Sequence, residues 1–432
     1  MNRLGALLKT PRFWMLFATL ATRGMGFLNS FLLSRLVGVQ ALGEYAGLVN
    51  TASAVATPFA QAVTNNATVL GAEGNRKGST YFRALAKKNL ILVAGLSIFL
   101  MGAFVLLYEH ALGPRDEGGS TLFLIGGGSV VVGQMVGAVT IGFLYGRGAF
   151  VLASRLSIVV AVVVMLTIYP VVRSWGLEGA LCLLLPTSLL PPLLLGVWVM
   201  RRHADSADTK GSNSEISDQS WSDAIARLVR AWPLIGASAF NNAVNWICTI
   251  YLVNRTFGTE GVGVVAVAIQ WQTLMVMPAT SWGGVAMKAL ADAAARRNVA
   301  LLRHSVRDLV RKNVAVTFAL ALLIGLLSGA IARAYGLADT NVALLICLNG
   351  LCAVVASTYN IFERLLQALH LQHRWLLFSM FAFSSQILLT WGLIKYGLWA
   401  VPLGVLLAGM LLSLLGLLTL YRYKEKPIGN IE

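Results

Sequence analysis

The chain has 432 residues, of which 57% are hydrophobic and only 12% carry a charge, and its mean hydropathy is +0.72. Soluble domains carry about 25% charged residues, so this composition excludes a soluble globular protein. The net charge of +16 would favour a nucleic-acid partner in a soluble protein, but the positions of the basic residues explain it differently here.

Apolar stretches of about 20 residues, the length that a helix needs to cross a bilayer core, follow one another along the chain. Backbone groups in lipid must bond one another, and these stretches are too long for barrel strands, so they predict helices. The predicted spans are 13–36, 45–70, 89–108, 121–146, 151–172, 179–200, 231–254, 262–287, 313–334, 341–363, 375–394 and 397–420. We therefore predict an all-α polytopic membrane protein with twelve transmembrane helices.

Lysine and arginine lie mainly on one side of this predicted topology. With both termini in the cytoplasm, 27 of the 34 basic residues lie in cytoplasmic segments and six on the outer side, and Arg23 lies within a helix. The positive-inside rule therefore predicts cytoplasmic termini. Anionic lipid headgroups account for the basic charge, and no nucleic-acid partner is needed. The basic segment 1–12 precedes an apolar stretch too long for a signal peptide, which we interpret as the first span.

The polar segment 201–230 predicts a cytoplasmic linker between two six-helix bundles, residues 1–200 and 231–432. The two halves are related by a repeat, because residues 35–58 align without a gap on 255–278. The alignment pairs Arg35 with Arg255, Gly38 with Gly258, Gly43 with Gly263, Ala46 with Ala266 and Pro58 with Pro278; a later match pairs Gly176 with Gly397. Parallel repeats of this kind are common in secondary transporters, with the substrate path at their interface.

Polar residues within the spans are the candidate binding residues. Arg23 lies near the centre of the first span, with no carboxylate within one helical turn, and a charge in a membrane core is costly unless it has a function. The second span carries one polar face, made of Asn50, Ser53, Thr57, Gln61, Thr64 and Thr68. The predicted substrate-binding residues are Arg23, Asn29, Gln61, Asn65, Asn241, Asn242, Asn245, Trp246, Gln270, Trp271, Trp282 and Asn360. Amides edged by aromatic rings suit sugars; the alternative is hydrogen bonding between helices.

Glu363 is the one carboxylate set well within an apolar run, and with Arg364 it is the candidate for carrying a coupling proton or ion. An interfacial ion pair of Glu363 with Arg364 or Arg374 is the alternative. The four cysteines match no metal or redox spacing and no Walker sequence occurs, so we expect no metal, no cofactor and no ATPase activity.

The stretch RGMGFLNSFLLSRLVGVQALGEYAGL, residues 23–48, together with the six-plus-six arrangement, resembles the Wzx-type flippases of the multidrug/oligosaccharidyl-lipid/polysaccharide exporter superfamily. The resemblance implies a MATE-like fold of two pseudo-symmetric bundles in the bacterial inner membrane. It implies transport of undecaprenyl-diphosphate-linked oligosaccharide, as in O-antigen assembly, to the periplasmic leaflet by alternating access. Family cavities hold several basic residues, whereas here only Arg23 is clearly central.

Two other functions stay open at this point. A multidrug or cation antiporter of the MATE type would need acidic groups in its cavity, of which this sequence has few. A membrane polysaccharide polymerase or ligase would need a large outer loop, whereas every predicted outer loop is short. We expect a transporter rather than an enzyme, with the lipid-linked oligosaccharide, membrane lipids and either H⁺ or Na⁺ as partners.

Overall fold

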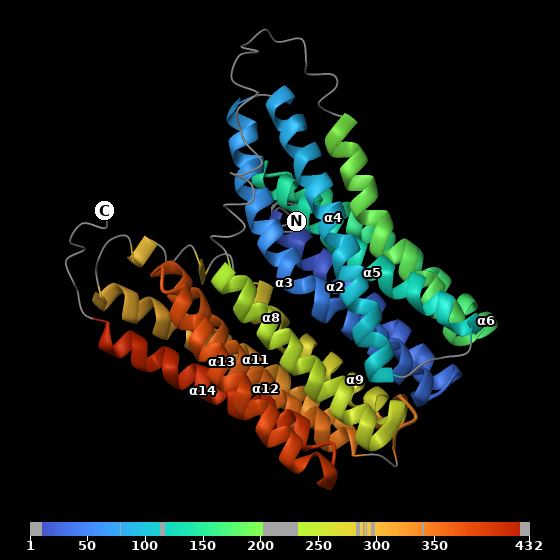
Figure 1. Ribbon diagram of the computed structural model, residues 1–432. Coiled ribbons are helices and arrows are strands. Elements are labelled where there is room, and N and C mark those ends of the chain that lie inside the picture. Colours follow the sequence, from blue (N-terminus) through green and yellow to red (C-terminus); the bar gives the residue numbers. More distant parts are fainter. Residues whose placement is uncertain are drawn as a thin grey trace, which may run out of the picture. The chain divides into compact units, whose positions relative to one another are not determined.

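The computed structural model describes residues 11–77, 79–112, 117–201, 232–281, 286–287, 290, 292–294, 299–338 and 341–423, and within these residues it contains helices and turns but no strand. Contacts divide the chain into two compact units, Met1–Trp246 and Ile247–Glu432. The helices of the first unit run from blue to yellow-green in Figure 1. They are α2 (Pro11–Leu36), α3 (Val39–Lys77), α4 (Ser79–Leu112), α5 (Glu117–Gly146), α6 (Phe150–Arg201) and α8 (Trp232–Trp246).

The second unit begins with a π-helical turn, η1 (Ile247–Tyr251), which continues directly into α9 (Leu252–Ser281). The remaining elements are α11 (Val299–Ala334), α12 (Val342–Ala368), α13 (Gln372–Leu393), the 3₁₀ turn η2 (Ile394–Tyr396) and α14 (Ala400–Arg422). The unit boundary thus follows α8 instead of preceding it. The domain boundaries drawn from the sequence stay a prediction, since residues 202–231 lie outside the described part of the chain.

Nine helical segments of the described residues are long and apolar enough to cross a membrane, which indicates a multi-pass membrane protein. Two of these segments, Phe150–Val197 and Trp232–Thr280, contain 48 and 49 residues. Each is two helices joined at a glycine that leaves the helical conformation, Gly176 with φ 55° and Gly258 with φ 68°. The glycine is needed there because a Cβ atom strains the backbone at positive φ.

The internal repeat extends to backbone conformation. Gly38 and Gly258, paired by the repeat, have φ values of 120° and 68°, while the second pair, Gly176 and Gly397, have 55° and 153°. Pro58 and Pro278, also paired, both lie inside helices, α3 and α9. Both glycines of each pair thus have positive φ, and both prolines lie in helix interiors.

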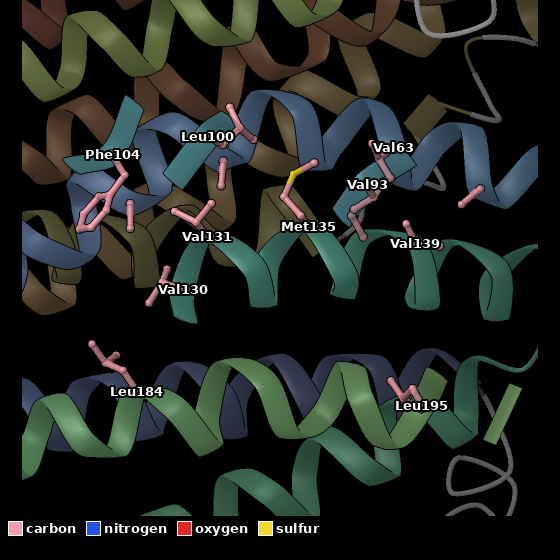
Figure 2. Close-up of a cluster of buried hydrophobic side chains, with 14 of the residues drawn as sticks. Val63, Val93, Leu100, Phe104, Val130, Val131, Met135, Val139, Leu184 and Leu195 are labelled. Atoms are coloured by element: carbon pink, nitrogen blue, oxygen red, sulfur yellow. The ribbon is translucent and has the colours of Figure 1, made fainter. Parts of the chain in front are cut away.

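The core of the first unit lies where α5 packs against α3, α4 and α6. Figure 2 shows its central side chains, including Phe104 of α4 and Met135 of α5. The Phe104 ring lies directly against Gly127 of α5, where any side chain would collide with it. Gly133 likewise admits the main chain of α6 at Ser188. Small residues let helices approach closely in lipid, where packing replaces the hydrophobic effect as the source of association.

The second unit is held by α12, which packs on α9, α11 and α14. A cluster of buried apolar residues joins the ends of α11, α12 and α14; it comprises Ala286, Leu290, Ala293, Leu302, Val306, Ile361, Phe362, Leu365 and Leu420. This cluster surrounds the part of α12 that carries Glu363 and Arg364, so the packing of α12 determines where the candidate coupling residues lie.

Candidate substrate-binding site

Arg23 lies on an exposed face of α2, together with Leu16 and Leu20. Helix α2 contains no acidic residue, and no described residue forms a hydrogen bond or ion pair with the Arg23 side chain. A methyl group built on Gly26, one turn further on, would meet no atom within 4 Å. Helix α2 also packs on α6, and a Cβ built on Gly24, beside Arg23, would contact Met165. The first unit therefore leaves a membrane-embedded guanidinium that is partly exposed and has no partner among the described residues.

Asn29, two turns further along α2, is placed differently from Arg23. It is only 5% exposed, and its side chain lies against that of Tyr45 of α3. Its amide oxygen is buried and accepts no hydrogen bond from the described residues. Asn29 thus sits within the packing of α2 on α3 in the isolated unit.

The polar face predicted for α3 is divided by α5. Gln134 of α5 donates to the Ser53 hydroxyl (3.0 Å) and accepts from the Thr57 hydroxyl (3.3 Å), so this part of the face is used for packing. One and two turns further on, Gln61 and Asn65 are exposed. Gln61 and Asn65, the two predicted binding residues on α3, are therefore both accessible.

The three asparagines of α8 are half-buried and bond mainly within their own helix. Asn245 donates to the Asn241 side chain (2.6 Å), and Asn242 donates to the backbone oxygen (2.7 Å) and hydroxyl of Ser238. Trp246, which ends the helix, is only 8% exposed.

Trp246 has an interhelical partner. Its indole N–H donates to the Thr51 hydroxyl (2.8 Å), which in turn donates to the Gly47 carbonyl (2.7 Å). This chain of bonds joins α8 to α3 within the first unit, in agreement with the extensive packing between the two helices. In this unit Trp246 therefore positions α8 rather than presenting a free ring.

In the second unit, Gln270 and Trp271 of α9 are both half-buried. The Gln270 amide oxygen is buried without a hydrogen-bond partner among the described residues. Trp271 interacts with Tyr335, at the turn after α11, and burial raises the pKa of Tyr335 to about 12. Trp282 lies outside the described residues.

Asn360, Glu363 and Arg364 are half-buried on α12. The Glu363 carboxylate accepts a hydrogen bond from the Gln367 amide (3.2 Å) one turn away. No ion pair joins Glu363 to Arg364 or Arg374 in the described residues, so the interfacial ion pair considered from the sequence is not formed. The Glu363 carboxylate still interacts electrostatically with the Arg364 guanidinium, although the two are not within ion-pair distance.

Sequence reasoning missed Gln134 and Thr51, which hold α3 to α5 and to α8. Gln134 is the one amide within the apolar stretch of α5, which is the signal that could have indicated an interhelical contact. No cluster of three or more histidine, cysteine, aspartate or glutamate residues capable of holding a metal occurs in the described residues.

The comparisons with solved structures concern the whole chain. A multidrug resistance MATE family transporter of the MOP superfamily in an inward-facing conformation matches with a TM-score of 0.69 and 16% identity, over 92% of this chain and 94% of its own. Such a transporter in an outward-facing conformation matches with a TM-score of 0.66 and 16% identity, over 96% of each chain. The chain has the fold of the MATE transporters.

A further match is a MOP superfamily transporter from Pyrococcus furiosus, described as having a binding pocket of reversed polarity that suggests a different function. Its TM-score is 0.66 and its identity 15%, over 98% of this chain and 99% of its own. No protein-family model and no curated protein sequence matches the chain. The identities are low, so these comparisons define the fold and leave the substrate to be argued from the residues.

Proposed function

We propose that this protein is a twelve-span transporter of the MOP superfamily that flips lipid-linked oligosaccharide across the bacterial inner membrane by alternating access. Helix length supports the twelve crossings. The 52 residues of α6 would extend about 78 Å as one straight helix, more than twice the bilayer core of about 30 Å. Gly176 and Gly258 then mark reversals at the membrane surface, and α6 and the α8–α9 helix each cross twice, as two six-helix bundles require.

The partly exposed guanidinium of Arg23, which has no partner among the described residues, is the observation that carries the substrate assignment. A cation facing lipid is strongly disfavoured, so the exposed face of α2 borders a hydrated path. Its natural partner there is an anion, and a guanidinium binds phosphate through charge-assisted, bidentate hydrogen bonds. The diphosphate of a polyprenyl-linked sugar supplies that anion, while the exposed amides of Gln61 and Asn65 supply bonds for hydroxyl groups.

Transport of such a headgroup is favoured by the membrane potential. A negative interior drives an anion outward by about 2.3 kcal/mol per charge per 100 mV. The protein needs only to offer a hydrated path for the headgroup, while the polyprenyl chain remains in lipid. The occurrence of the same fold in inward-facing and outward-facing conformations supports alternating access as the mechanism.

Glu363 favours a second candidate, an antiporter that exchanges H⁺ or Na⁺ for an organic cation. Its carboxylate forms no ion pair in the described residues, although it interacts electrostatically with Arg364, and a coupling ion would bind in competition with that arginine. The Pyrococcus furiosus protein supports treating pocket charge as variable within this fold. The two candidates differ in the sign of the cargo, and Arg23 and Glu363 therefore discriminate between them.

The test is translocation of a fluorescent undecaprenyl-diphosphate oligosaccharide in proteoliposomes, measured by reagent access to the outer leaflet. We expect Arg23→Gln to lower the rate at least about tenfold, because a charge-assisted hydrogen bond contributes roughly 1.5–3 kcal/mol. Arg155→Gln is the matched control, since Arg155 is an exposed arginine of the same unit that stacks on the Trp14 ring at 4.5 Å. Wild-type rates for Arg23→Gln would contradict the flippase proposal.

Efflux of organic cations by the same vesicles tests the antiporter. If the vesicles export organic cations, and this efflux is lost in Glu363→Gln but unchanged in Arg23→Gln, the chain is an antiporter. If lipid flipping persists in Glu363→Gln but ceases in Arg23→Gln, it is a flippase whose transport does not depend on Glu363.

A further inference from the structure

An 11-residue motif occurs twice, once in each unit. Residues 169–179 read YPVVRSWGLEG and residues 251–261 read YLVNRTFGTEG, so both contain a tyrosine, an arginine four residues later, an aromatic–glycine pair, and Glu-Gly. The offset between them is 82 residues, unlike the offset of 220 that relates the two halves. The first copy spans the kink of α6 and the second the kink of α9, elements labelled in Figure 1.

Both copies fold in the same way. Arg173 donates to the Tyr169 hydroxyl (2.9 Å) and Arg255 donates to the Tyr251 hydroxyl (3.0 Å). Three residues after each arginine the backbone turns at a glycine with positive φ. The closing glycine of each motif, Gly179 in the first copy, is buried and packs against the aromatic residue four positions earlier.

The charged groups of the motif are all turned outward. Arg173 and Glu178 are exposed in the first copy, and Arg255 and Glu260 are exposed in the second. No ion pair joins the arginine to the glutamate in either copy, although they lie on the same turn. Beside them stands an exposed ring, 66% exposed for Trp175. A fixed cation and a separate anion thus face the surroundings together with an aromatic ring.

This combination matches the membrane interface. Aromatic rings settle at the level of the headgroups, and the tyrosine hydroxyl fixes the guanidinium, which reduces the side-chain entropy lost when a ligand binds. A guanidinium recognises phosphate, and the carboxylate five residues later in the chain is an acceptor for hydrogen bonds from an ammonium group. The two charges held apart are complementary to a headgroup that carries both a phosphate and an ammonium.

We propose that each motif is a binding site for a zwitterionic phospholipid headgroup with a primary amine, of the phosphatidylethanolamine type. The arginine holds the phosphate, the glutamate accepts from the ammonium, and the aromatic residue contacts the upper acyl region. Topologically, both turns follow an odd-numbered crossing, so they lie at the same membrane face, one in each bundle. The proposal depends on the spans and not on the identity of the transported substrate.

Two other turns of the chain provide internal controls. Arg35 also precedes a positive-φ glycine by three residues, but Phe31 stands at the tyrosine position and Gln40 at the glutamate position. Arg333 precedes Gly336 in the same way and directs its Nε to the carbonyl of Gly329 (3.4 Å) instead of to a tyrosine. These turns share the exposed arginine with the motif but lack the hydroxyl and the carboxylate.

The experiment measures lipids retained by the full-length protein from nanodiscs containing equal parts of phosphatidylethanolamine, phosphatidylcholine and phosphatidylglycerol, by native mass spectrometry. We expect the wild type to retain about threefold or more phosphatidylethanolamine than phosphatidylcholine, because the methylated amine of phosphatidylcholine cannot donate hydrogen bonds. A factor of this size corresponds to the small contribution of an exposed ion pair. Glu178→Gln with Glu260→Gln should abolish this preference, and Arg173→Gln with Arg255→Gln should lower the retention of all three lipids. Arg35→Gln should change neither.

Equal retention of phosphatidylethanolamine and phosphatidylcholine by the wild type would overturn the proposal, as would an unchanged preference in the double glutamate variant. A variant that elutes as aggregate is replaced by Tyr169→Phe with Tyr251→Phe, which frees the arginines without changing charge. That pair should weaken retention, and full wild-type retention would exclude the motif as a site. Flipping activity is measured in parallel; its loss in Arg23→Gln without any change in lipid preference separates the two proposals.

Discussion

The hydrogen bond from the Trp246 indole to the Thr51 hydroxyl joins α8 to α3, and its removal tests how much this bond stabilises their packing. Thr51→Val nearly preserves the side-chain shape but removes the hydroxyl that accepts from the indole and donates to the Gly47 carbonyl. The indole nitrogen, in a residue that is only 8% exposed, loses this acceptor. The perturbation is therefore confined to one interhelical contact inside the first unit.

The expected cost lies between two limits. A buried donor that loses its partner costs about 1–3 kcal/mol, whereas interhelical hydrogen bonds in membrane proteins contribute only about 0.6 kcal/mol on average. Because the side chain is almost fully buried, we expect Thr51→Val to lower the free energy of unfolding by about 1–2 kcal/mol. For a unit of this size each kcal/mol corresponds to a fall in Tm of roughly 2–4 °C.

A double-mutant cycle isolates the bond from the change in packing. Thermal unfolding in detergent is compared for the wild type, Thr51→Val, Trp246→Phe and the double variant, and we expect a coupling energy of about 1 kcal/mol. Thr19→Val is the matched control, because the Thr19 hydroxyl bonds only to Met15 of its own helix (2.9 Å). Additive effects, within about 0.3–0.5 kcal/mol, would refute the view that this bond holds α8.

Three other substitutions test packing and backbone conformation by the same unfolding measurement. Gly133→Ala should cost about 1–3 kcal/mol because its methyl group collides with the main chain of α6, while Gly137→Ala, which has room, should be nearly neutral. Phe104→Ala, which empties the fully buried site against α5, should cost about 3–5 kcal/mol, and a loss below 1 kcal/mol would contradict that packing. Gly258→Ala should cost about 1–3 kcal/mol through backbone strain alone, since φ 68° with ψ −172° is a conformation that essentially only glycine adopts and its surroundings are open. Gly329→Ala, also in open space but helical, should be neutral or stabilising, and equal effects at both glycines would exclude backbone strain.

Hydropathy alone predicted the helical spans well, because crossing a bilayer requires long apolar helices whatever their neighbours. The span predicted at 13–36 corresponds to α2, and those predicted at 151–172 and 179–200 correspond to the two parts of α6 on either side of Gly176. Helices extend past the predicted ends, as in α11, which begins at Val299 before a span predicted to start at residue 313. Helical hydrogen bonding continues outside the lipid, where hydropathy no longer reports it.

The direction in which polar side chains point was harder to predict, because it depends on the partner helix. Periodicity correctly placed Ser53 and Thr57 on one face of α3, but only the position of α5 shows that Gln134 occupies that face. Trp246 is an apolar ring with a polar edge, and the sequence could not distinguish a ligand contact from its bond to Thr51. Arg23 is the opposite case, because the sequence alone shows an arginine within an apolar stretch with no carboxylate within one helical turn.

The division of one continuous helix between two units has a consequence for fragment complementation. Residues 232–246 pack with the first unit yet are joined to the second through the π-helical turn Ile247–Tyr251. If the chain were cut before residue 232, each of the two polypeptides would be incomplete. The N-terminal piece would expose the surface of α3 on which α8 packs. The C-terminal piece would carry α8 without the helix it packs against. The two pieces would then reassociate by packing of α8 against α3, and this contact would hold them together without a peptide bond between them.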